Sequence, residues 1–411
     1  MKRLICTVLV CAALLSLLSA CGSASEDLMK DIVPAESAAD GEYADCADAA
    51  AEFALRAFEK SLGTGEGETL ISPLSLLSAL AMTANGAEGE TLAQMEQVLG
   101  APMADLNHWL RDYAAALPQS KEAKLHTANG IWLRDCDGLK VERDFLQTNA
   151  DFFGAEVSKA PFDSGTVRQI NDFVDKNTDG MIKEIVSDFD PSVMLCLVNA
   201  LGFDAQWQST YTEGSVREGI FTAADGREQT ADFMHCTVHE YLLTDKAQGF
   251  LKRYKGGDYA FAALLPDEGV SIEECVASLS GETLRKTMLE RQDKEVRTSL
   301  PKFENEYFTD MSEVLSKLGM TDAFLPDRAD FEAMAQYSGG GLFISSVLHK
   351  TKIQVFEQGT KAGAATAVAV TGAGMPVEEP KQVYLDRPFL YMIVDCSEFV
   401  PVFIGAVTQM N

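Results

Sequence analysis

The sixteen residues from Ala362 to Val377 are the strongest constraint that this sequence places on a fold. The segment carries no charge and no aromatic ring, and only Met375 is larger than Val. Its side chains are too small for a well-packed core strand, and it is too apolar for an ordinary flexible linker. The fold must therefore accommodate a segment that can be either an exposed loop or a strand.

The sequence around this segment predicts one large domain. No repeat or low-complexity stretch interrupts residues 46–411, and 46% apolar with 23% charged residues is usual for a globular protein. Ala47 to Leu62 has helical spacing of apolar residues, and Ser72 followed by Pro73 is a typical start of a second helix. Helices are also predicted at 91–99 and at 168–185, closing near Asp179-Gly180. Strand-like runs dominate later, so we expect an α+β fold; they are 193–201, 259–265, 342–347, 353–356, 389–394 and 402–407.

The N-terminus predicts export. A short basic region, residues 1–3, precedes an apolar run at 4–20 that is short for a membrane span and ends in small residues, as a secretory signal does. Cys21, directly after Leu18-Ser19-Ala20, resembles the lipidated cysteine of bacterial lipoproteins; the alternative is an ordinary cleaved signal with a chance Cys. We expect residues 1–20 to be a signal peptide and 21–45 to be the lipidated Cys21 with a disordered acidic tether. The domain would then be held on the extracellular face of a bacterial membrane, or be shed from it.

The net charge of the chain indicates which partners it can bind, and its cysteines indicate whether disulfide bonds are expected. The 34 Lys and Arg against 62 Asp and Glu give a net charge of −28, which should repel nucleic acid and attract cationic proteins. Outside the signal and anchor, six cysteines are scattered singly, and export would permit disulfides between them. Cys196 and Cys396 lie in apolar runs that are typical of buried thiols, so we expect mostly free thiols.

The sequence contains no recognisable catalytic pattern. GxSxG, a phosphate-binding loop, HExxH and CxxC are all missing from it. The one metal-like cluster is His235-Cys236 with His239, which could share an ion if the segment were helical. In FMHCTVHEYLL the alternation favours a strand instead, where four residues span ~13 Å. We therefore expect no metal, no cofactor and no enzyme.

Six stretches together resemble the serpin family. They occur in the family's order and spacing, and they extend from about residue 47 to the end of the chain. The stretches are LISPLSLLSALAMTANGAEGETLAQMEQVLG (70–100), INDFVDKNTDGMIKEIV (170–186), LVNALGFDAQWQ (197–208), SLPKFENEYFTDMSEVLSKLGMTDAF (299–324), LFISSVLHKTKIQVFEQGT (342–360) and DRPFLYMIVDCSEFVPVFIGAV (386–407). The resemblance implies a serpin fold with three β-sheets, eight to nine helices and an exposed reactive-centre loop at about 357–384.

The resemblance gives the uncharged segment a role. Serpin-type inhibition depends on a loop that is exposed at first and later inserts as a new strand of a sheet. The stretch Glu357-Gln358-Gly359-Thr360 resembles the family's hinge. By two-residue alternation one face of the inserting strand would turn toward the core, namely Thr360, Ala362, Ala364, Thr366, Val368 and Val370. Lys361, where the family more often has an acid, lies on the other face and would stay in solvent.

The family's spacing also implies where a target protease would cleave. Sixteen residues after Glu357 the count reaches Ala373, so Ala373–Gly374 is the first choice of bond. Counting back from Pro388 instead places the cleaved bond near Val377. The bond Val370–Thr371 is a third option. Cleavage after Met375 is disfavoured because Pro376 follows it. Because the window holds no Arg, Lys or large aromatic residue, we expect a protease with a shallow, elastase-like pocket.

Five further residues match the family's gating positions. Ser72, Ser75, Asn199 and His349 match a polar cluster beneath the sheet that opens, and Trp207 matches the Trp near the point where insertion starts. Satisfied core polar groups would look the same in sequence. We interpret the cluster as a network that holds the sheet closed and re-forms around an inserted strand.

These features predict a suicide-type inhibitor of serine proteases, most simply elastase-like ones. The protease serine would attack Ala373, and insertion of the loop into the central sheet would trap the acyl-enzyme. The alternatives are a non-inhibitory serpin-fold binding protein at the cell surface and an inhibitor of cysteine proteases. We expect a monomer.

Overall fold

The structure is a computed structural model that describes residues 25–35, 43–118, 122–360 and 379–410. In this part of the chain nine α-helices and three β-sheets are present, which confirms the α+β prediction. The helices are α2 (Ala47–Ser61), α3 (Pro73–Ala84), α4 (Gly89–Leu99), α5 (Met103–Ala116), α6 (Arg143–Phe153), α7 (Ser164–Asn177), α8 (Ile272–Val276), α9 (Gly281–Leu289) and α10 (Ser312–Leu318).

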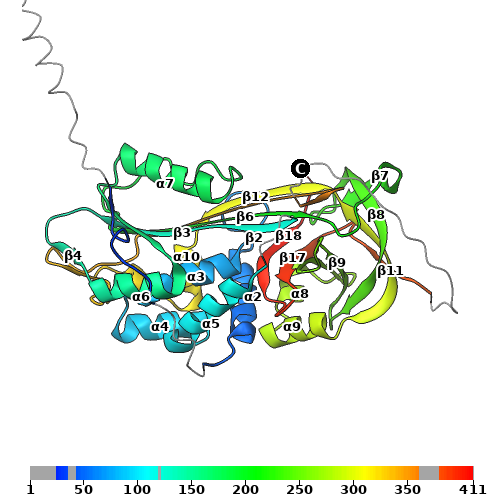
Figure 1. The fold of residues 1–411 in the computed structure, drawn as a ribbon. Coiled ribbons are helices and arrows are strands. Elements are labelled where there is room, and N and C mark those ends of the chain that lie inside the picture. Colours follow the sequence, from blue (N-terminus) through cyan, green and yellow to red (C-terminus); the bar gives the residue numbers. More distant parts are fainter. Residues whose placement is uncertain (1–24, 36–42, 119–121, 361–378, 411) are drawn as a thin grey trace, which may run out of the picture.

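The seven-stranded sheet is called the central sheet here. Its order is β1 (Glu26–Asp27), β5 (Glu156–Ala160), β3 (Ala123–Arg134), β6 (Leu195–Gln206), β15 (Gly359–Thr360), β14 (Ser346–Phe356) and β12 (Phe303–Asp310). Figure 1 shows α7 on one face of this sheet and α3, α5 and α6 on the other. Because both faces are covered, β6 reads as an almost continuous apolar run rather than an alternating one.

The second sheet has nine strands and packs beside the central one (Figure 1). Its order is β16 (Lys381–Tyr384), β11 (Gln292–Pro301), β8 (Glu228–Leu243), β9 (Ala247–Arg253), β10 (Tyr259–Pro266), β17 (Phe389–Asp395), β18 (Pro401–Val407) and β2 (Leu70–Ile71), with β7 (Val216–Thr222) paired to β8. β4 (Leu139–Val141) and β13 (Ala335–Tyr337) form the third sheet. One large buried cluster, which includes Phe53, Phe203, Tyr259 and Tyr391, joins the two main sheets.

The line between β6 and β14, called the seam here, determines how the site is built. The two strands pair directly and in parallel from Cys196↔Ser346 to Gly202↔Lys352. Beyond that point they separate, and β15 lies between them, antiparallel to both. The central sheet is therefore closed along most of the seam and already holds the first two residues of an additional strand at one end.

Most predicted elements are confirmed, and three have different limits. The strand predicted at 193–201 is β6, which continues to Gln206. The runs predicted at 342–347 and 353–356 form the single strand β14, which begins only at Ser346. The helix predicted over 168–185 ends at Asn177, because Asp179 and Gly180 adopt φ of 52° and 73° in the left-handed region. The following residues instead lie over the sheet, tied back to α7 by Asn171.

The predicted tether is partly docked on the domain. β1 pairs antiparallel with β5, the Gln147 side chain donates to the carbonyl of Val33, and Asp151 accepts from the backbone N–H of Ala35. Disorder is therefore the wrong description for residues 25–35. Cys21 and the predicted signal lie outside the described residues.

The predicted loop limits of 357–384 also change at both ends. Residues 359–360 form β15 of the central sheet, and 381–384 form β16, which pairs in parallel with β11. The section between them, residues 361–378, lies outside the described part of the chain. In the part that is described, the structure contains no helix long and apolar enough to cross a membrane.

Candidate functional site

The described part of the hinge occupies the end of the seam. β14 finishes at Phe356, the chain turns through Glu357 and Gln358, and Gly359 and Thr360 return between β14 and β6. A Cβ on Gly359 would lie 2.0 Å from the carbonyl oxygen of Ala205, so only glycine fits this close approach. The predicted hinge residues Glu357, Gly359 and Thr360 are thus at the entrance of the sheet.

Thr360 is buried and already faces the interior. It has no exposed surface, and its hydroxyl lies 2.6 Å from the hydroxyl of Tyr254. Burial raises the pKa of Tyr254, so this phenol is protonated at neutral pH and can donate or accept in the pair. The inward orientation predicted for Thr360 from alternation is therefore the one that the structure has.

Trp207 fixes the turn that leads into β15. Its indole Nε1 donates to the carbonyl of Phe356 at 2.8 Å, and its backbone N–H donates to the carbonyl of Gln358 at 2.9 Å. The indole stacks on the ring of Tyr254, with centroids 4.5 Å apart and an interplanar angle of 10°. Trp207 therefore holds both the strand that precedes the hinge and the aromatic residue that contacts Thr360.

Charged groups complete the entrance. Lys302 Nζ lies 3.1 Å from Glu357 and 2.9 Å from Asp232, and hydrogen bonding to Asp232 and then to Glu357 raises the pKa of Lys302. Lys252 lies over the ring of Tyr211 at 4.4 Å, and burial lowers the pKa of Lys252. The hinge acid is thus held by an ion pair at the surface of the entrance.

Further along the seam, a buried polar cluster ties β6 to β14. His349 Nδ1 lies 2.5 Å from Asn199 Oδ1, and the backbone N–H of Ser72 donates to His349 Nε2 at 3.1 Å. The Asn199 amide donates to Ser75 Oγ at 2.5 Å and to Asn129 Oδ1 at 2.6 Å. These five residues, from β6, β14, β3 and the start of α3, are called the gate.

The contacts of His349 fix its protonation. Because Nε2 accepts from a backbone N–H, the single ring proton is on Nδ1, which donates to Asn199. Complete burial lowers the pKa of His349 from 6.5 to about 3. The gate is therefore an uncharged network at neutral pH, and it crosses the seam at the level where a new strand would have to pass.

The structure separates the five predicted gating residues into two groups. Ser72, Ser75, Asn199 and His349 are in the gate. Trp207 directly follows the end of β6 at the hinge, eight residues after Asn199 and ~26 Å away by strand rise. Sequence reasoning missed Asn129. Its signal was a polar residue at an inward position of the alternating stretch Leu125 to Leu133. The predicted positions Ala362, Ala364, Ala373 and Gly374 lie outside the described residues.

A strap of chain after α7 covers the seam on its other face. Asn171 accepts from the backbone N–H groups of Ile185 and Val186 at 2.9 and 3.2 Å, and its amide donates to the carbonyl of Val186 at 2.8 Å. Met181 lies directly on Gly202 of β6, where a Cβ would be 2.6 Å from its sulfur. Opening of the seam therefore requires residues 181–186, called the strap here, to move.

The remaining predictions concern a histidine cluster and the cysteines. His235 and His239 lie on strand β8, as predicted. No group of three or more His, Cys, Asp or Glu residues that could hold a metal ion occurs within the described ranges. The six cysteines within the described residues are free, which confirms the prediction of mostly free thiols.

Comparison with known proteins agrees with this geometry. A family model described as Serpin (serine protease inhibitor) matches residues 48–410. An uncharacterized serpin-like protein of Thermococcus kodakarensis is 32% identical over 355 residues, which cover 84% of this chain and 82% of the relative.

Solved structures give the same result. The thermophilic serpin tengpin in its native state is 43% identical, with a TM-score of 0.89 over 94% of this chain and 100% of that one. For its latent state the TM-score is 0.79, over 90% of this chain and 100% of that one. Human thyroxine-binding globulin is 25% identical, with a TM-score of 0.77 over 89% of this chain and 98% of that one.

Two observations now coincide. The hinge lies at one end of the seam and the gate lies farther along the same seam. The family model matches nearly all of the domain. Serpins generally inhibit proteases and are not catalysts themselves. This chain belongs to the serpin family.

Proposed function

We propose that the protein is a suicide-type inhibitor of serine proteases with small apolar specificity, and that it acts by inserting its loop along the seam. The observation that carries the proposal is the register of β15. Thr360 pairs with Ala205 of β6 and with Val355 of β14. Antiparallel pairing continued from this point assigns each following loop residue one neighbour on each strand.

The continued register places small or apolar loop residues beside mostly apolar neighbours, and it places a loop Thr beside the polar gate. Ala362 would lie between Phe203 and Ile353, and Ala364 between Leu201 and Thr351. Thr366 would arrive between Asn199 and His349 of the gate, where its hydroxyl can replace the hydrogen bond that the separating strands lose. Val368 and Val370 would follow against Leu197 and Leu195 at the far end of the seam.

The opposite face of the inserted strand fits as well. Lys361, which departs from the acid more usual in the family, would lie beside Asp204 and Gln354 on the side of α7. The next members of that face are Gly363, Ala365, Ala367 and Ala369, which are small enough to pass beneath the strap. The uncharged segment of the sequence therefore has the side chains that this seam requires on both faces.

The trap follows from the length of the inserted strand. After attack on Ala373, the acyl-enzyme is attached to the end of a loop whose hinge is already between the strands. About fourteen inserted residues span ~46 Å, which carries the protease to the far end of the sheet. Displacements of ~1 Å already cost catalysis about a hundredfold, so deacylation stops.

We also propose that the inhibitor works at a cell surface. The N-terminal signal-like run and Cys21 support export and lipid anchoring. The net charge of −28 would favour encounter with cationic proteases in the surroundings. The anchor is tested by labelling with a radioactive fatty acid, which Cys21→Ser should abolish.

The central test uses the purified chain without its signal and a panel of proteases. An elastase should give a covalent complex that survives denaturing electrophoresis, with release of a peptide that begins at Gly374. Trypsin-like and chymotrypsin-like enzymes should be inhibited far less. Cleavage of the loop with continued turnover and no complex would overturn the proposal.

The alternative function is that of a non-inhibitory binding protein, and it is favoured by the similarity to thyroxine-binding globulin. The similarity to thyroxine-binding globulin shows that the same fold is found in a protein whose name denotes binding of a small molecule. A non-inhibitory binding protein would be cleaved in the loop without forming a complex. An inhibitor of cysteine proteases would form its complex with a papain-like enzyme in the same panel.

A further inference from the structure

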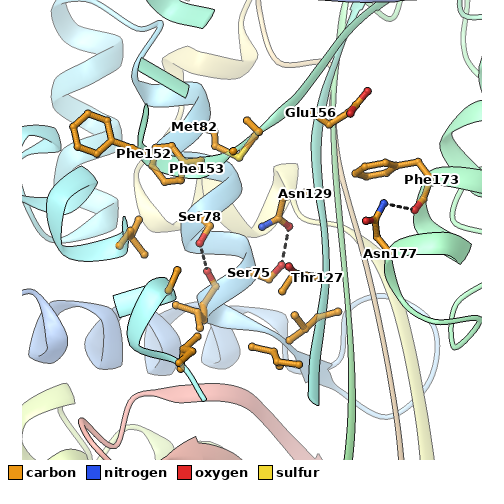
Figure 2. Close-up of a pocket in the computed structure, with 18 of the residues that line it drawn as sticks. Ser75, Ser78, Met82, Thr127, Asn129, Phe152, Phe153, Glu156, Phe173 and Asn177 are labelled. Carbon is orange, nitrogen blue, oxygen red and sulfur yellow. Dashed lines mark hydrogen bonds between the residues drawn. The ribbon is translucent and has the colours of Figure 1, made fainter. Parts of the chain in front are cut away.

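Two nucleophilic side chains meet on the second sheet, away from the gate. They are the thiol of Cys236 on β8 and the amine of Lys252 on β9. The cavity of about 610 Å³ between α3 and β3 differs in kind. Figure 2 shows that hydroxyl, amide and aromatic groups face it, such as those of Ser78, Asn129 and Phe173, and none of these three is a nucleophile at neutral pH.

The thiol of Cys236 lies in a polar environment. Its Sγ is 3.8 Å from Lys252 Nζ, 3.2 Å from the hydroxyl oxygen of Thr298 and 3.5 Å from that of Tyr211. Cys236 is partly exposed, so a small oxidant can reach it from solvent. A thiol that is accessible and has polar neighbours is the kind that peroxides oxidise.

The amine of Lys252 is held on the inner side of the same cluster. The residue is only 4% exposed, and Nζ donates to the carbonyl of Ser209 at 2.8 Å and lies over the rings of Tyr211 and Trp207. Among its contacts in the described part of the chain there is no carboxylate. Burial lowers the pKa of Lys252, and the neighbouring Cys236 acts in the opposite direction. Burial thus favours the neutral amine, which is the nucleophilic form.

We propose that Cys236 and Lys252 form a reversible sulfenamide cross-link when the protein meets a peroxide. The peroxide transfers one oxygen atom to Sγ, which loses two electrons, and the products are a sulfenic acid and water or an alcohol. The lone pair of Nζ then attacks Sγ, the S–O bond breaks, and the hydroxyl leaves as water with one proton of the amine. The hydroxyls of Thr298 and Tyr211 are close enough to Sγ to donate to the leaving oxygen. Two thiol molecules restore Cys236 and Lys252 and become a disulfide themselves.

The cross-link would lie behind the hinge. It ties β8 to β9 and removes the positive charge beside Ser209. That residue lies between Trp207 and Tyr211, whose backbone N–H groups donate to the carbonyls of Gln358 and Glu357. A peroxide would therefore act on the wall that holds the entrance of the seam. This consequence rests on the proposed function, whereas the cross-link itself does not.

The experiment treats the whole chain with hydrogen peroxide, digests it under non-reducing conditions and identifies linked peptides by mass spectrometry. The peptides that carry Cys236 and Lys252 should appear as one species. Its mass should be about 2 Da below the sum of the two, since two hydrogens are lost. Dithiothreitol should separate the peptides again.

Variants of Lys252 test the role of the amine. Lys252→Arg keeps a cation but cannot condense, because a guanidinium stays protonated. It should give no linked species and should leave Cys236 as a sulfenic acid that dimedone labels. Lys252→Met keeps an unbranched apolar stem and should give the same result, which covers the case that the larger Arg does not fit.

Cys396→Ser is the matched control. Cys396 is partly exposed, as Cys236 is, but its basic neighbours are the guanidinium groups of Arg253 and Arg291. This variant should form the link as the unsubstituted protein does.

Three results would each overturn the proposal. They are an oxidised Cys236 with no link to Lys252, a disulfide between two chains through Cys236, and an unreacted Cys236 at a peroxide concentration that oxidises Cys396. None of them would touch the inhibitory function, which is measured separately with proteases.

Discussion

At the scale of single residues, the neutral His349 makes the gate sensitive to acid. Its pKa is about 3 in the folded protein and 6.5 in the unfolded chain, so the unfolded state binds more protons between these values. The contribution of His349 to stability is therefore complete above pH 6.5 and is lost as the pH falls toward 3. At pH 5 the loss amounts to about 2 kcal/mol.

The measurement is urea unfolding at pH 7 and pH 5. The protein should lose about 2 kcal/mol more than the variant His349→Gln, which cannot titrate. His239→Gln is the control, because His239 is exposed on β8, and its pH dependence should follow that of the unsubstituted protein. Parallel curves for the protein and His349→Gln would contradict the assignment of a buried neutral imidazole.

Thr360 gives a second prediction at this scale. The residue is fully buried and contacts Tyr254, so Thr360→Arg would place an unpaired charge in the entrance of the seam. A cost of only ~1.4 kcal/mol on insertion changes the ratio of trapping to hydrolysis about tenfold. We expect the number of inhibitor molecules consumed per inactivated protease to rise at least about tenfold.

Thr360→Ser is the control, because it keeps the hydroxyl and should inhibit normally. Unchanged inhibition by Thr360→Arg would exclude insertion of the loop into the sheet at Thr360.

At the scale of elements, the strap that follows α7 sets how easily the seam opens. Asn171→Ala removes three hydrogen bonds to the strap and leaves the N–H groups of Ile185 and Val186 without this acceptor, which costs about 1–3 kcal/mol. The variant should unfold at lower urea concentration and should incorporate a synthetic peptide of the sequence 360–370 faster. Asn177→Ala loses one bond within α7 and should change uptake little. Equal uptake rates in both variants would mean that the strap does not limit opening.

The elements themselves were largely predictable, and the exceptions have physical reasons. The start of α3 at Ser72-Pro73 is a local signal, and the Ser72 side chain does accept from the backbone of Ser75. The docking of residues 25–35 depends on separate contacts with Asp151 and Gln147, more than a hundred residues away, which no local pattern encodes. The length of β14 was missed because two of its buried positions hold the polar residues His349 and Thr351, which interrupt the apolar alternation.

For the candidate site, the sequence predicted the residues better than their arrangement. The inward face of the hinge followed from alternation, and Ser72, Ser75, Asn199 and His349 do meet in one network. Asn129 was missed because its partner Asn199 lies on another strand. The distance between Trp207 and the gate became clear only when Leu195–Gln206 was seen to form one extended strand, β6, that separates them.

At the scale of the whole molecule, the proposed trapping of a protease depends on strain that loop insertion releases. The structure is more similar to the native than to the latent state of tengpin, and β6 pairs directly with β14 from Cys196 to Gly202. Insertion of residues 360–370 would add a strand that is paired on both sides along the whole seam. Cleavage of the loop should therefore make the protein more stable, which is the reverse of the usual effect of a nick.

The most direct test compares thermal unfolding before and after a protease cuts once within residues 361–378. With both fragments still associated, we expect the midpoint of thermal unfolding to rise by more than about 10 °C, since several kcal/mol are gained and each is worth ~2–4 °C in a large domain. Cleaved Thr360→Arg should not show this rise. An unchanged or lower midpoint after cleavage of the unsubstituted protein would contradict loop insertion and, with it, the proposed inhibitory mechanism.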